Sequence, residues 1–307
     1  MIHARGLTKR YGTRTAVDGI DFTVEPGRVT GFLGPNGAGK STTMRMIVGL
    51  DRPTAGTVTV GGHPYRSSAA PLREVGVLLD AKAVHSGRTA YKHLLAMGAT
   101  HGIGKERVRE VIGMTGLESV AGKRVKGFSL GMGQRLGIAA ALLGDPGILI
   151  LDEPVNGLDP EGVRWVRTLV RGLAAEGRTV LLSSHLMSEM AQTADQLIVL
   201  GRGRILEDAP VGDVISRTNG TTVRVRTNDL GRLAALVAGD GVTVNREADG
   251  SATLSGVTPE RIGDSAAAAG LPIYELTVVS GSLEDAYLTL TADEVEYRST
   301  AAEEIAR

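Results

Sequence analysis

The order of hydrophobic and polar positions along the first part of the chain predicts a parallel α/β sheet. Short β-prone runs separated by turns occupy residues 2–7, 17–24 and 29–33, and a helical pattern covers 41–48. A strand, a glycine-rich loop and a helix thus follow one another, an order typical of the opening of such a sheet. Residues 82–145 carry helical patterns and no strand pattern, so we expect a helical insertion there.

The sheet pattern returns after this insertion. An apolar strand is expected at 148–151, followed by an amphipathic helix over about 161–175 with its apolar residues on one face. Further strands are expected at 179–183 and 196–200. Together these elements predict a first domain that covers residues 1–215 and belongs to the α/β class.

A different pattern begins near residue 216 and predicts a second, smaller α+β domain. Its elements follow the order β-α-β-β-α-β, which is that of a ferredoxin-like split unit. The expected strands cover 221–227, 242–247, 251–255 and 273–279, and the expected helices cover 229–238 and a segment that starts at Pro259. We place this domain at 216–292 and interpret residues 293–307 as a tail.

Composition narrows the class of protein. The 307 residues are 42% hydrophobic and 22% charged, which is ordinary for a globular chain of about two domains. Lys plus Arg and Asp plus Glu number 34 each, so no global positive field would attract nucleic acid. Without cysteine, neither disulfides nor thiolate metal sites are possible. No apolar run approaches the ~18 residues of a membrane-spanning helix, and the N-terminus lacks the apolar core of a secretory signal.

The first chemical motif follows the strand at 29–33. Residues 34–42 fit the pattern G-x-x-x-x-G-K-S/T between a strand and a helix. Glycines let the backbone N–H groups turn toward phosphate oxygens, and the N-terminus of the following helix adds its dipole. Lys40 is expected to reach the β- and γ-phosphates of ATP, and Ser41 to ligate Mg²⁺. The nucleotide-binding residues predicted here are Gly34, Pro35, Asn36, Gly37, Ala38, Gly39, Lys40, Ser41 and Thr42.

A second motif is the apolar strand at 148–151, which ends in the carboxylates Asp152 and Glu153. A buried central strand would deliver both to the edge of a phosphate site. Asp152 is expected to hold Mg²⁺, and Glu153 to polarise the attacking water as the general base. Taken alone, the carboxylates at the end of such a strand could equally well belong to an N-cap or a loop. Their place after the phosphate loop favours the catalytic interpretation.

Between the two motifs, residues 128–135 read Phe-Ser-Leu-Gly-Met-Gly-Gln-Arg. This segment resembles the signature motif of ATP-binding cassette (ABC) ATPases, usually Leu-Ser-Gly-Gly-Gln, with Ser129 and Gly131 as direct matches. Leu130 and Met132 depart from that consensus, and without the family context a helix N-cap would fit the segment equally well. In the family, the signature of one subunit closes over the γ-phosphate bound to the other. The resemblance therefore implies that Ser129 and Gly131 act in trans, across a dimer of identical or paralogous chains.

Further positions follow in the order that the family shows, over roughly residues 1–215. Tyr11 lies where these proteins stack an aromatic ring on adenine. Asp159 belongs to a segment that resembles the D-loop, which crosses the dimer interface, and His185 matches the switch histidine that contacts the γ-phosphate. The catalytic residues that the resemblance implies are Glu153, His185 and Lys40.

One position departs from the family pattern. After the apolar run 75–79, the chain has Asp80 where the family usually has a glutamine. A carboxylate there could still bind Mg²⁺ or water, but it is shorter and adds negative charge near the phosphates. We expect Asp80 to be a neighbour of the metal site, with a plain loop aspartate as the alternative.

The resemblance also implies a function. The implied fold is a P-loop NTPase domain with a mixed sheet core, an antiparallel β layer and a helical subdomain. The implied activity is the hydrolysis of ATP with Mg²⁺, which powers a separate transmembrane permease at the cytoplasmic face of the cell membrane. The appended domain, which ends in the segment 282–288, resembles that of drug and antibiotic exporters and favours export of a hydrophobic compound.

Two other functions compete with this interpretation. A soluble ABC protein of translation or DNA maintenance usually has two cassettes or a long coiled coil, and the sequence shows neither pattern. A nucleotide binder that no longer hydrolyses ATP is disfavoured because Lys40, Asp152, Glu153 and His185 are all present. We expect no nucleic-acid partner. The appended domain is expected to serve dimerisation or stability, with regulation by a bound molecule as the alternative.

Overall fold

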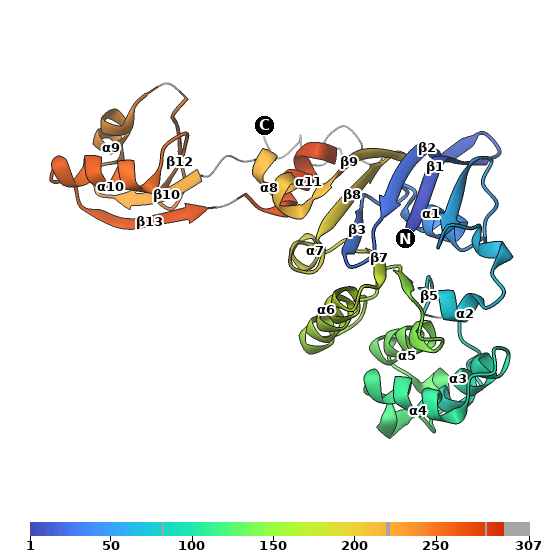
Figure 1. Ribbon diagram of the computed structural model, residues 1–307. Coiled ribbons are helices and arrows are strands. Elements are labelled where there is room, and N and C mark those ends of the chain that lie inside the picture. Colours follow the sequence, from blue (N-terminus) through green and yellow to red (C-terminus); the bar gives the residue numbers. More distant parts are fainter. Residues whose placement is uncertain (82, 219–221, 240, 280, 292–307) are drawn as a thin grey trace. The chain divides into compact units, whose positions relative to one another are not determined.

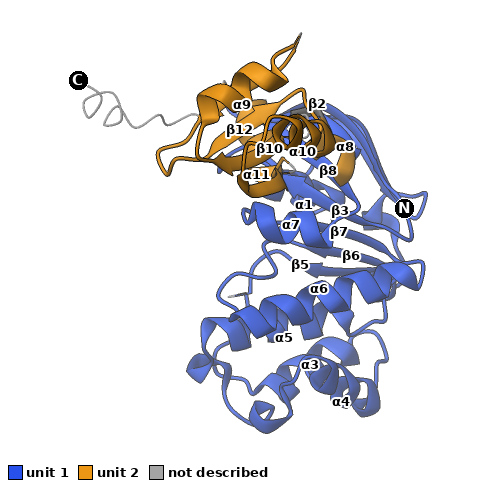
Figure 2. Ribbon diagram, turned by 90° about the vertical axis from the view of Figure 1, so that its left-hand side faces the viewer, with its two compact units in different colours: residues 1–209, 293–307 blue, residues 210–292 orange. Residues whose placement is uncertain are grey.

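The computed structural model describes residues 1–291 except 82, 219–221, 240 and 280. These residues form two compact units, which meet in the chain between Ala209 and Pro210 (Figure 2). The division thus precedes the expected domain boundary at residue 215, because the helix that follows Pro210 belongs with the second unit. The predicted tail, 293–307, lies outside the described residues.

The first unit is built on a six-stranded sheet of order β5-β6-β7-β3-β8-β9 (Figure 1). The strands are β3 (Val29–Leu33), β5 (Val75–Leu78), β6 (Ile148–Leu151), β7 (Thr179–Ser183), β8 (Gln196–Gly201) and β9 (Arg204–Pro210). Those from β5 to β8 run parallel, and β3, β6 and β7 are buried along their whole length. Because these strands are parallel, the loops that follow β3, β5, β6 and β7 meet at one edge of the sheet.

An antiparallel layer of order β2-β1-β4 packs on this sheet. Its strands are β1 (Ile2–Tyr11), β2 (Arg14–Val24) and β4 (Ala55–Val60). Phe22 on β2 meets Phe32 on β3 edge to face, with 5.3 Å between the ring centroids, and both rings lie in one buried apolar cluster. The hydrophobic pattern alone does not indicate β4, because its first residues are small and exposed.

Helices cover the sheet and form the expected insertion. The α-helices are α1 (Lys40–Ile47), α2 (Pro71–Glu74), α3 (Ala90–Ala99), α4 (Lys105–Met114), α5 (Leu130–Leu142), α6 (Pro160–Ala175) and α7 (Met187–Thr193). Short 3₁₀ turns cover Tyr65–Ser67, Glu118–Val120 and Val125–Gly127. The insertion contains α3, α4 and α5, which pack against one another. Helix α5 starts at Leu130, before the apolar pattern that begins near Gln134, because Ser129 caps it by accepting a hydrogen bond from the N–H of Met132.

The second unit confirms the ferredoxin-like order. Its elements are α8 (Val211–Thr218), β10 (Thr222–Thr227), α9 (Leu230–Val237), β11 (Thr243–Arg246), β12 (Ala252–Ser255), α10 (Pro259–Ala268), β13 (Ile273–Val279) and α11 (Leu283–Thr291). The four strands form an antiparallel sheet of order β11-β12-β10-β13. Helices α9 and α10 cover one face of this sheet and enclose a small apolar core with it, while α8 and α11 contact each other.

Within the described residues, no helix has the length and apolar character needed to cross a lipid bilayer.

Candidate functional site

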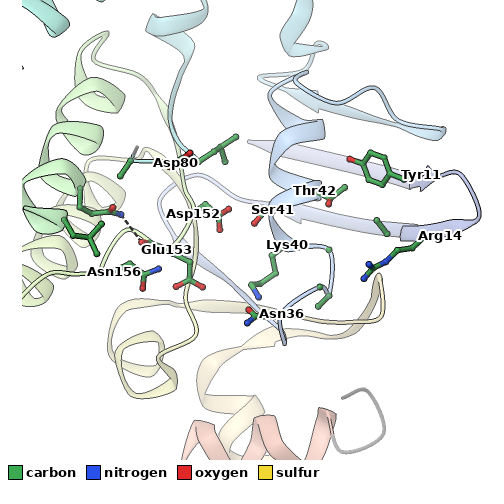
Figure 3. A pocket seen from close by; sticks show the side chains of 18 residues that line it. Tyr11, Arg14, Asn36, Lys40, Ser41, Thr42, Asp80, Asp152, Glu153 and Asn156 are labelled. Atoms are coloured by element: carbon green, nitrogen blue, oxygen red, sulfur yellow. Dashed lines mark hydrogen bonds between the residues drawn. The ribbon is translucent and has the colours of Figure 1, made fainter. Parts of the chain in front are cut away.

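A cavity of about 800 Å³ lies where the loops after β3, β5 and β6 meet beside the antiparallel layer (Figure 3). It brings together eleven of the predicted residues, which are Tyr11, Asn36, Gly37, Ala38, Gly39, Lys40, Ser41, Thr42, Asp80, Asp152 and Glu153. Its lining also includes residues to which sequence reasoning assigned no role, among them Arg14, Ala16, Leu130, Gln134 and Asn156. Segments distant in sequence therefore build one site.

The glycine-rich loop needs its glycines because the backbone passes close to its neighbours. Gly34 has φ of 154°, and a Cβ there would lie 2.4 Å from the carbonyl oxygen of Leu200. Gly39, the N-cap of α1, has φ of 107°, and a Cβ there would lie 2.7 Å from the carbonyl oxygen of Ala16. Both positions are therefore closed to other residues, and the loop folds tightly ahead of α1.

Lys40, the first residue of α1, carries a buried cation at the floor of the cavity. Its Nζ donates hydrogen bonds to the carbonyl oxygens of Gly34, at 2.6 Å, and Pro35, at 3.2 Å. Burial lowers the pKa of Lys40, while the negative charges of Glu153 and Asp152 act in the opposite direction. Figure 3 shows these two carboxylates and Lys40 lining the same cavity.

The two carboxylates at the end of β6 are positioned by the neighbouring strand β7. The hydroxyl of Ser183, the last residue of β7, donates to Oδ1 of Asp152 at 2.5 Å and accepts from the backbone N–H of Glu153 at 2.9 Å. Ser183 is wholly buried. Sequence reasoning did not identify Ser183, although its place at the end of a strand beside β6 is the signal that could have found it.

Glu153 has an unusual backbone conformation, with φ of 49°. A left-handed conformation costs a non-glycine residue about 1–3 kcal/mol and persists only where the surroundings enforce it. The N–H of Glu153 is bound by Ser183, and its carbonyl oxygen accepts from Nε2 of Gln134 at 2.9 Å. Its carboxylate oxygen Oε2 lies 2.8 Å from Nδ1 of His185. Side chains from β7, α5 and the loop before α7 therefore hold the backbone and the carboxylate of Glu153.

The residues predicted to act in trans lie outside the cavity and serve their own chain. Ser129 caps α5, and Asp159 caps α6 by accepting from the N–H of Gly162 at 2.9 Å. Gly131 lies against the segment before α6, because a Cβ there would be 2.9 Å from the carbonyl oxygen of Gly157. Ser129 and Asp159 are exposed, so both helix N-termini face the surface.

Tyr11, the last residue of β1, lies at the far end of the cavity from Glu153. Tyr11 is 48% exposed, and its hydroxyl donates to Oδ2 of Asp51 at 2.8 Å. Asp51 also accepts from Nε of Arg45 at 2.8 Å. The ammonium of Lys9 lies 4.8 Å from the ring centroid, so a cation covers one face of the ring.

The oxygen donors that could hold a magnesium ion are Ser41, Asp152 and Asp80. All three line the cavity, and a hydroxyl with one or two carboxylates, completed by phosphate oxygens and water, is the set that Mg²⁺ uses in phosphate sites. In the part of the chain that the structure describes, no group of three or more His, Cys, Asp or Glu side chains could hold a metal ion. Asp80 follows β5, which is the neighbour of β6 in the sheet.

Comparison with known proteins identifies the family. The family described as ABC transporter matches residues 17–156. YhcH, an ABC transporter ATP-binding protein of Bacillus subtilis (strain 168), is 34% identical to the chain, over 96% of this chain and 97% of that protein. The chain belongs to the ABC transporter family of ATP-binding proteins. This ABC ATPase therefore binds nucleotide and hydrolyses ATP, as the motifs predicted.

Two further relatives are similar to this chain over most of its length. The daunorubicin/doxorubicin resistance ATP-binding protein DrrA of Streptomyces peucetius is 37% identical, over 99% of this chain and 96% of that protein. The bacitracin transport ATP-binding protein BcrA of Bacillus licheniformis is 39% identical, over 77% of this chain and 78% of that protein. Residues 221–284 of this ABC ATPase match a family described as a domain of unknown function (DUF8746).

Solved structures agree on the fold of the first unit. An ATP-binding subunit of an ABC transporter superposes with a TM-score of 0.65 at 25% identity, over 71% of this chain and 92% of that one. The dimeric structure of MJ0796, a bacterial ABC transporter cassette, gives a TM-score of 0.64 at 24% identity, over 69% of this chain and 99% of that one. The predicted α/β fold of the P-loop type is thus confirmed.

Substitution of Ser183 by alanine is expected to lower kcat for ATP roughly tenfold, with little change in KM. The substitution removes a hydrogen bond to a carboxylate and the support of the strained Glu153 peptide, and hydrogen bonds to charged groups contribute about 1.5–3 kcal/mol. Steady-state phosphate release measures the effect. Ser184→Ala is the matched control, because the buried Ser184 hydroxyl accepts from the N–H of Leu186 and contacts neither carboxylate in the described residues. Equal losses in both variants would contradict the positioning role of Ser183.

Proposed function

We propose that this ABC ATPase powers a separate membrane permease that exports a drug, an antibiotic or another hydrophobic compound. The observation that carries the ATPase part of the proposal is a cavity lined by the glycine-rich loop on one side and by Asp152 and the anchored Glu153 on the other. The proposed direction of transport and the proposed class of substrate rest on two relatives. DrrA is named for daunorubicin/doxorubicin resistance, and BcrA is named for bacitracin transport. The likeness to DrrA supports them further because it includes the appended unit.

The residues of the cavity divide the work of ATP hydrolysis. The N–H groups of the loop 34–42 and the ammonium of Lys40 would hold the phosphates, and Ser41 and Asp152 would hold a magnesium ion with Asp80 beside it. When bound, that ion would neutralise charge on the phosphates. Glu153 would take the proton of the attacking water, and the contact with His185 orients the carboxylate for that task.

Adenine would stack on Tyr11 at the opposite end of the cavity. Lys9 covers one face of the ring, and the anchored hydroxyl fixes the plane of the ring through Asp51. The other face would receive the base, since stacking on an aromatic ring suits any flat π system. Arg14 lies between the ring and the phosphate loop and adds positive charge to this side of the cavity.

Two chains, identical or paralogous, would close over two ATP molecules. The exposed N-terminus of α5, with Ser129 and Gly131, would cover the γ-phosphate bound to the other chain, and Asp159 would lie at the same interface. The Ser129 hydroxyl accepts from its own helix and keeps a proton to donate. Because α5 also carries Gln134, which binds the Glu153 carbonyl, contact with the partner's nucleotide would reach the general base.

A second cavity supports docking of the permease. It measures about 410 Å³ and lies between the segment around α2 and the helix α3. Its lining consists of Tyr65, Pro71, Leu72, Arg88, Ala96, Met97, Thr100 and His101. An apolar groove with basic residues fits a short cytoplasmic helix of a membrane protein. Helix α2 leads directly into β5 and on to Asp80, so the groove and the nucleotide cavity share one continuous segment. Docking there would hold the ATPase at the cytoplasmic face of the membrane.

Purification of the tagged full chain from gently solubilised native membranes tests this function. The expected result is a polytopic membrane protein that co-purifies stoichiometrically after a salt wash that removes loosely bound nucleic acid. Ala96→Glu places a charge in the groove and should lose this partner, whereas Ala99→Glu changes another exposed alanine of the same helix that lies outside the groove. Both variants should keep soluble ATP turnover. Recovery of ribosomal or DNA-bound material without a membrane partner would overturn the proposal.

A further inference from the structure

The edge strand β13 of the second unit exposes apolar side chains along its length. It closes one margin of the four-stranded sheet, and within the described residues its only strand neighbour is β10 (Figure 1). Tyr274 is 59% exposed, Leu276 38% and Val278 51%. The outer edge of β13 therefore presents both backbone hydrogen-bonding groups and apolar surface.

Edge strands usually carry features that prevent pairing with another chain, such as lysine, proline or very short length. The opposite edge strand, β11, has four residues, Thr-Val-Asn-Arg, of which three are exposed. Strand β13 has seven residues, Ile-Tyr-Glu-Leu-Thr-Val-Val, with neither lysine nor proline. Its one charge, on Glu275, lies 3.5 Å from Nε of Arg224 on β10. One edge of the sheet is thus short and polar, whereas the other is long, apolar and locally charge-balanced.

The exposed side chains of β13 continue the core of the unit to its margin. In the pairing with β10, Leu276 lies opposite Val225 and Val278 opposite Val223, and both valines are wholly buried. These four residues consequently share the face that α9 and α10 cover. Helix α10 passes over Leu276, since a Cβ on Gly263 would lie 3.8 Å from it. A further strand beside β13 would extend this apolar layer.

We propose that the further strand is β13 of a second copy of this chain, paired antiparallel about a two-fold axis at Leu276. This contact goes beyond the ATP-dependent dimer, because it uses neither the phosphate loop nor the signature segment and needs no nucleotide. It joins the two sheets into one, with the helices of both copies on the same side. A two-fold axis brings the same surface of each copy together, so the strand must be complementary to itself.

The sequence of β13 meets this requirement with Leu276 at the centre. With Leu276 opposite its own copy, Glu275 faces Thr277, and Tyr274 faces Val278 of the second copy. Apolar residues then meet on the helix-covered face, and all seven residues of the strand find partners. A register centred on Glu275 would instead place two carboxylates directly opposite each other, which is unfavourable. Charge therefore disfavours Glu275 as the centre, and Leu276 is the centre that pairs all seven residues.

A constant contact between the appended units would keep two ATPase domains together after hydrolysis. Tethered domains rebind each other at a high effective concentration, so each new ATP molecule would close a dimer that has not separated completely. The appended unit would act as a dimerisation module, and the cycle would become largely independent of protein concentration.

Cysteine cross-linking of the nucleotide-free full chain tests the register. Because the native chain has no cysteine, Leu276→Cys introduces a single thiol. Residues directly opposite in an antiparallel pair have Cα atoms about 4.5–5.5 Å apart, which is within the Cα separation that a disulfide spans. In EDTA and mild oxidant, Leu276→Cys should form a covalent dimer. Asn245→Cys, an exposed position on the opposite edge strand, should not. Equal cross-linking of the two variants would overturn the proposal.

Light scattering of the same nucleotide-free protein at micromolar concentration tests the contact itself. The wild-type chain should have the mass of a dimer, Leu276→Lys the mass of a monomer, and Leu288→Lys, which alters an exposed leucine of α11, the mass of a dimer. If Leu276→Lys fails to fold, the cysteine variants decide. A monomeric wild-type chain, or cross-linking of Leu276→Cys to the membrane subunit instead of a second copy, would refute the proposal. ATP turnover is measured on the same samples. If the β13 contact is absent but turnover is intact, the dimer proposal fails while the ATPase assignment stands.

Discussion

Replacement of Glu153 by glutamine is expected to lower ATP turnover by roughly 10²–10⁴-fold, while ATP binding stays close to that of the wild type. The amide has the shape of the carboxylate and can keep the contacts that Ser183 and Gln134 make with the backbone of this residue. It cannot accept the proton of the attacking water. The closed state with ATP should therefore form and persist.

Two measurements check this prediction. Phosphate release gives the turnover, and light scattering with and without ATP gives the closed dimer. The second measurement is made in the Leu276→Lys background, so that the contact between β13 strands does not hide the effect of ATP. Glu161→Gln, an exposed acidic residue in the first turn of α6, is the control and should behave like the wild type. Retained turnover in Glu153→Gln would show that another residue is the general base, whereas lost turnover without an ATP-dependent dimer would contradict the expected closed state.

Replacement of Lys40 by alanine is expected to weaken ATP binding at least tenfold and to abolish measurable turnover. The substitution removes the buried cation at the phosphate loop, and hydrogen bonds to charged groups contribute about 1.5–3 kcal/mol each. Asp152 and Glu153, which face Lys40 across the cavity, would then repel the phosphates without compensation. ATP should consequently lose its stabilising effect on the fold.

Thermal unfolding with and without Mg²⁺ and ATP measures this loss. The wild-type chain should unfold at a higher temperature with nucleotide, and Lys40→Ala should show no such rise. The buried ammonium has a lowered pKa because burial disfavours its charge, so its removal should not destabilise the nucleotide-free protein. Lys105→Ala, an exposed lysine at the start of α4, provides the control. A normal nucleotide effect in Lys40→Ala would contradict the assigned role.

Features that depend on neighbouring residues in the chain could be predicted from the sequence. The phosphate loop is one continuous segment, and its glycines, its lysine and the helix after it are local properties. The same holds for the strand that ends in Asp152 and Glu153, and for the β-α-β-β-α-β order of the second unit. Family resemblance then predicted that Tyr11 stacks on adenine and that His185 contacts the γ-phosphate. In the structure Tyr11 lines the cavity, and Nδ1 of His185 lies 2.8 Å from Oε2 of Glu153.

Other features depend on which strands and helices become neighbours, and only the tertiary structure decides this. Ser183 supports Asp152 and Glu153 because β7 lies next to β6. Gln134 reaches the Glu153 carbonyl because α5 packs against β5, the other neighbour of β6. The first turn of α5 is set by the cap at Ser129 rather than by the hydrophobic period.

In the second unit, too, only the tertiary structure shows which strands are neighbours. The alternation in β13 predicts a strand, but it does not reveal that the strand lies at the margin of the sheet, because strand order is a property of the folded chain. Sequence by itself thus determined the chemistry and the local elements of this protein, since these arise from adjacent residues. The tertiary structure decided which side chains converge on Glu153 and which strand edge is open, since both depend on contacts between distant segments.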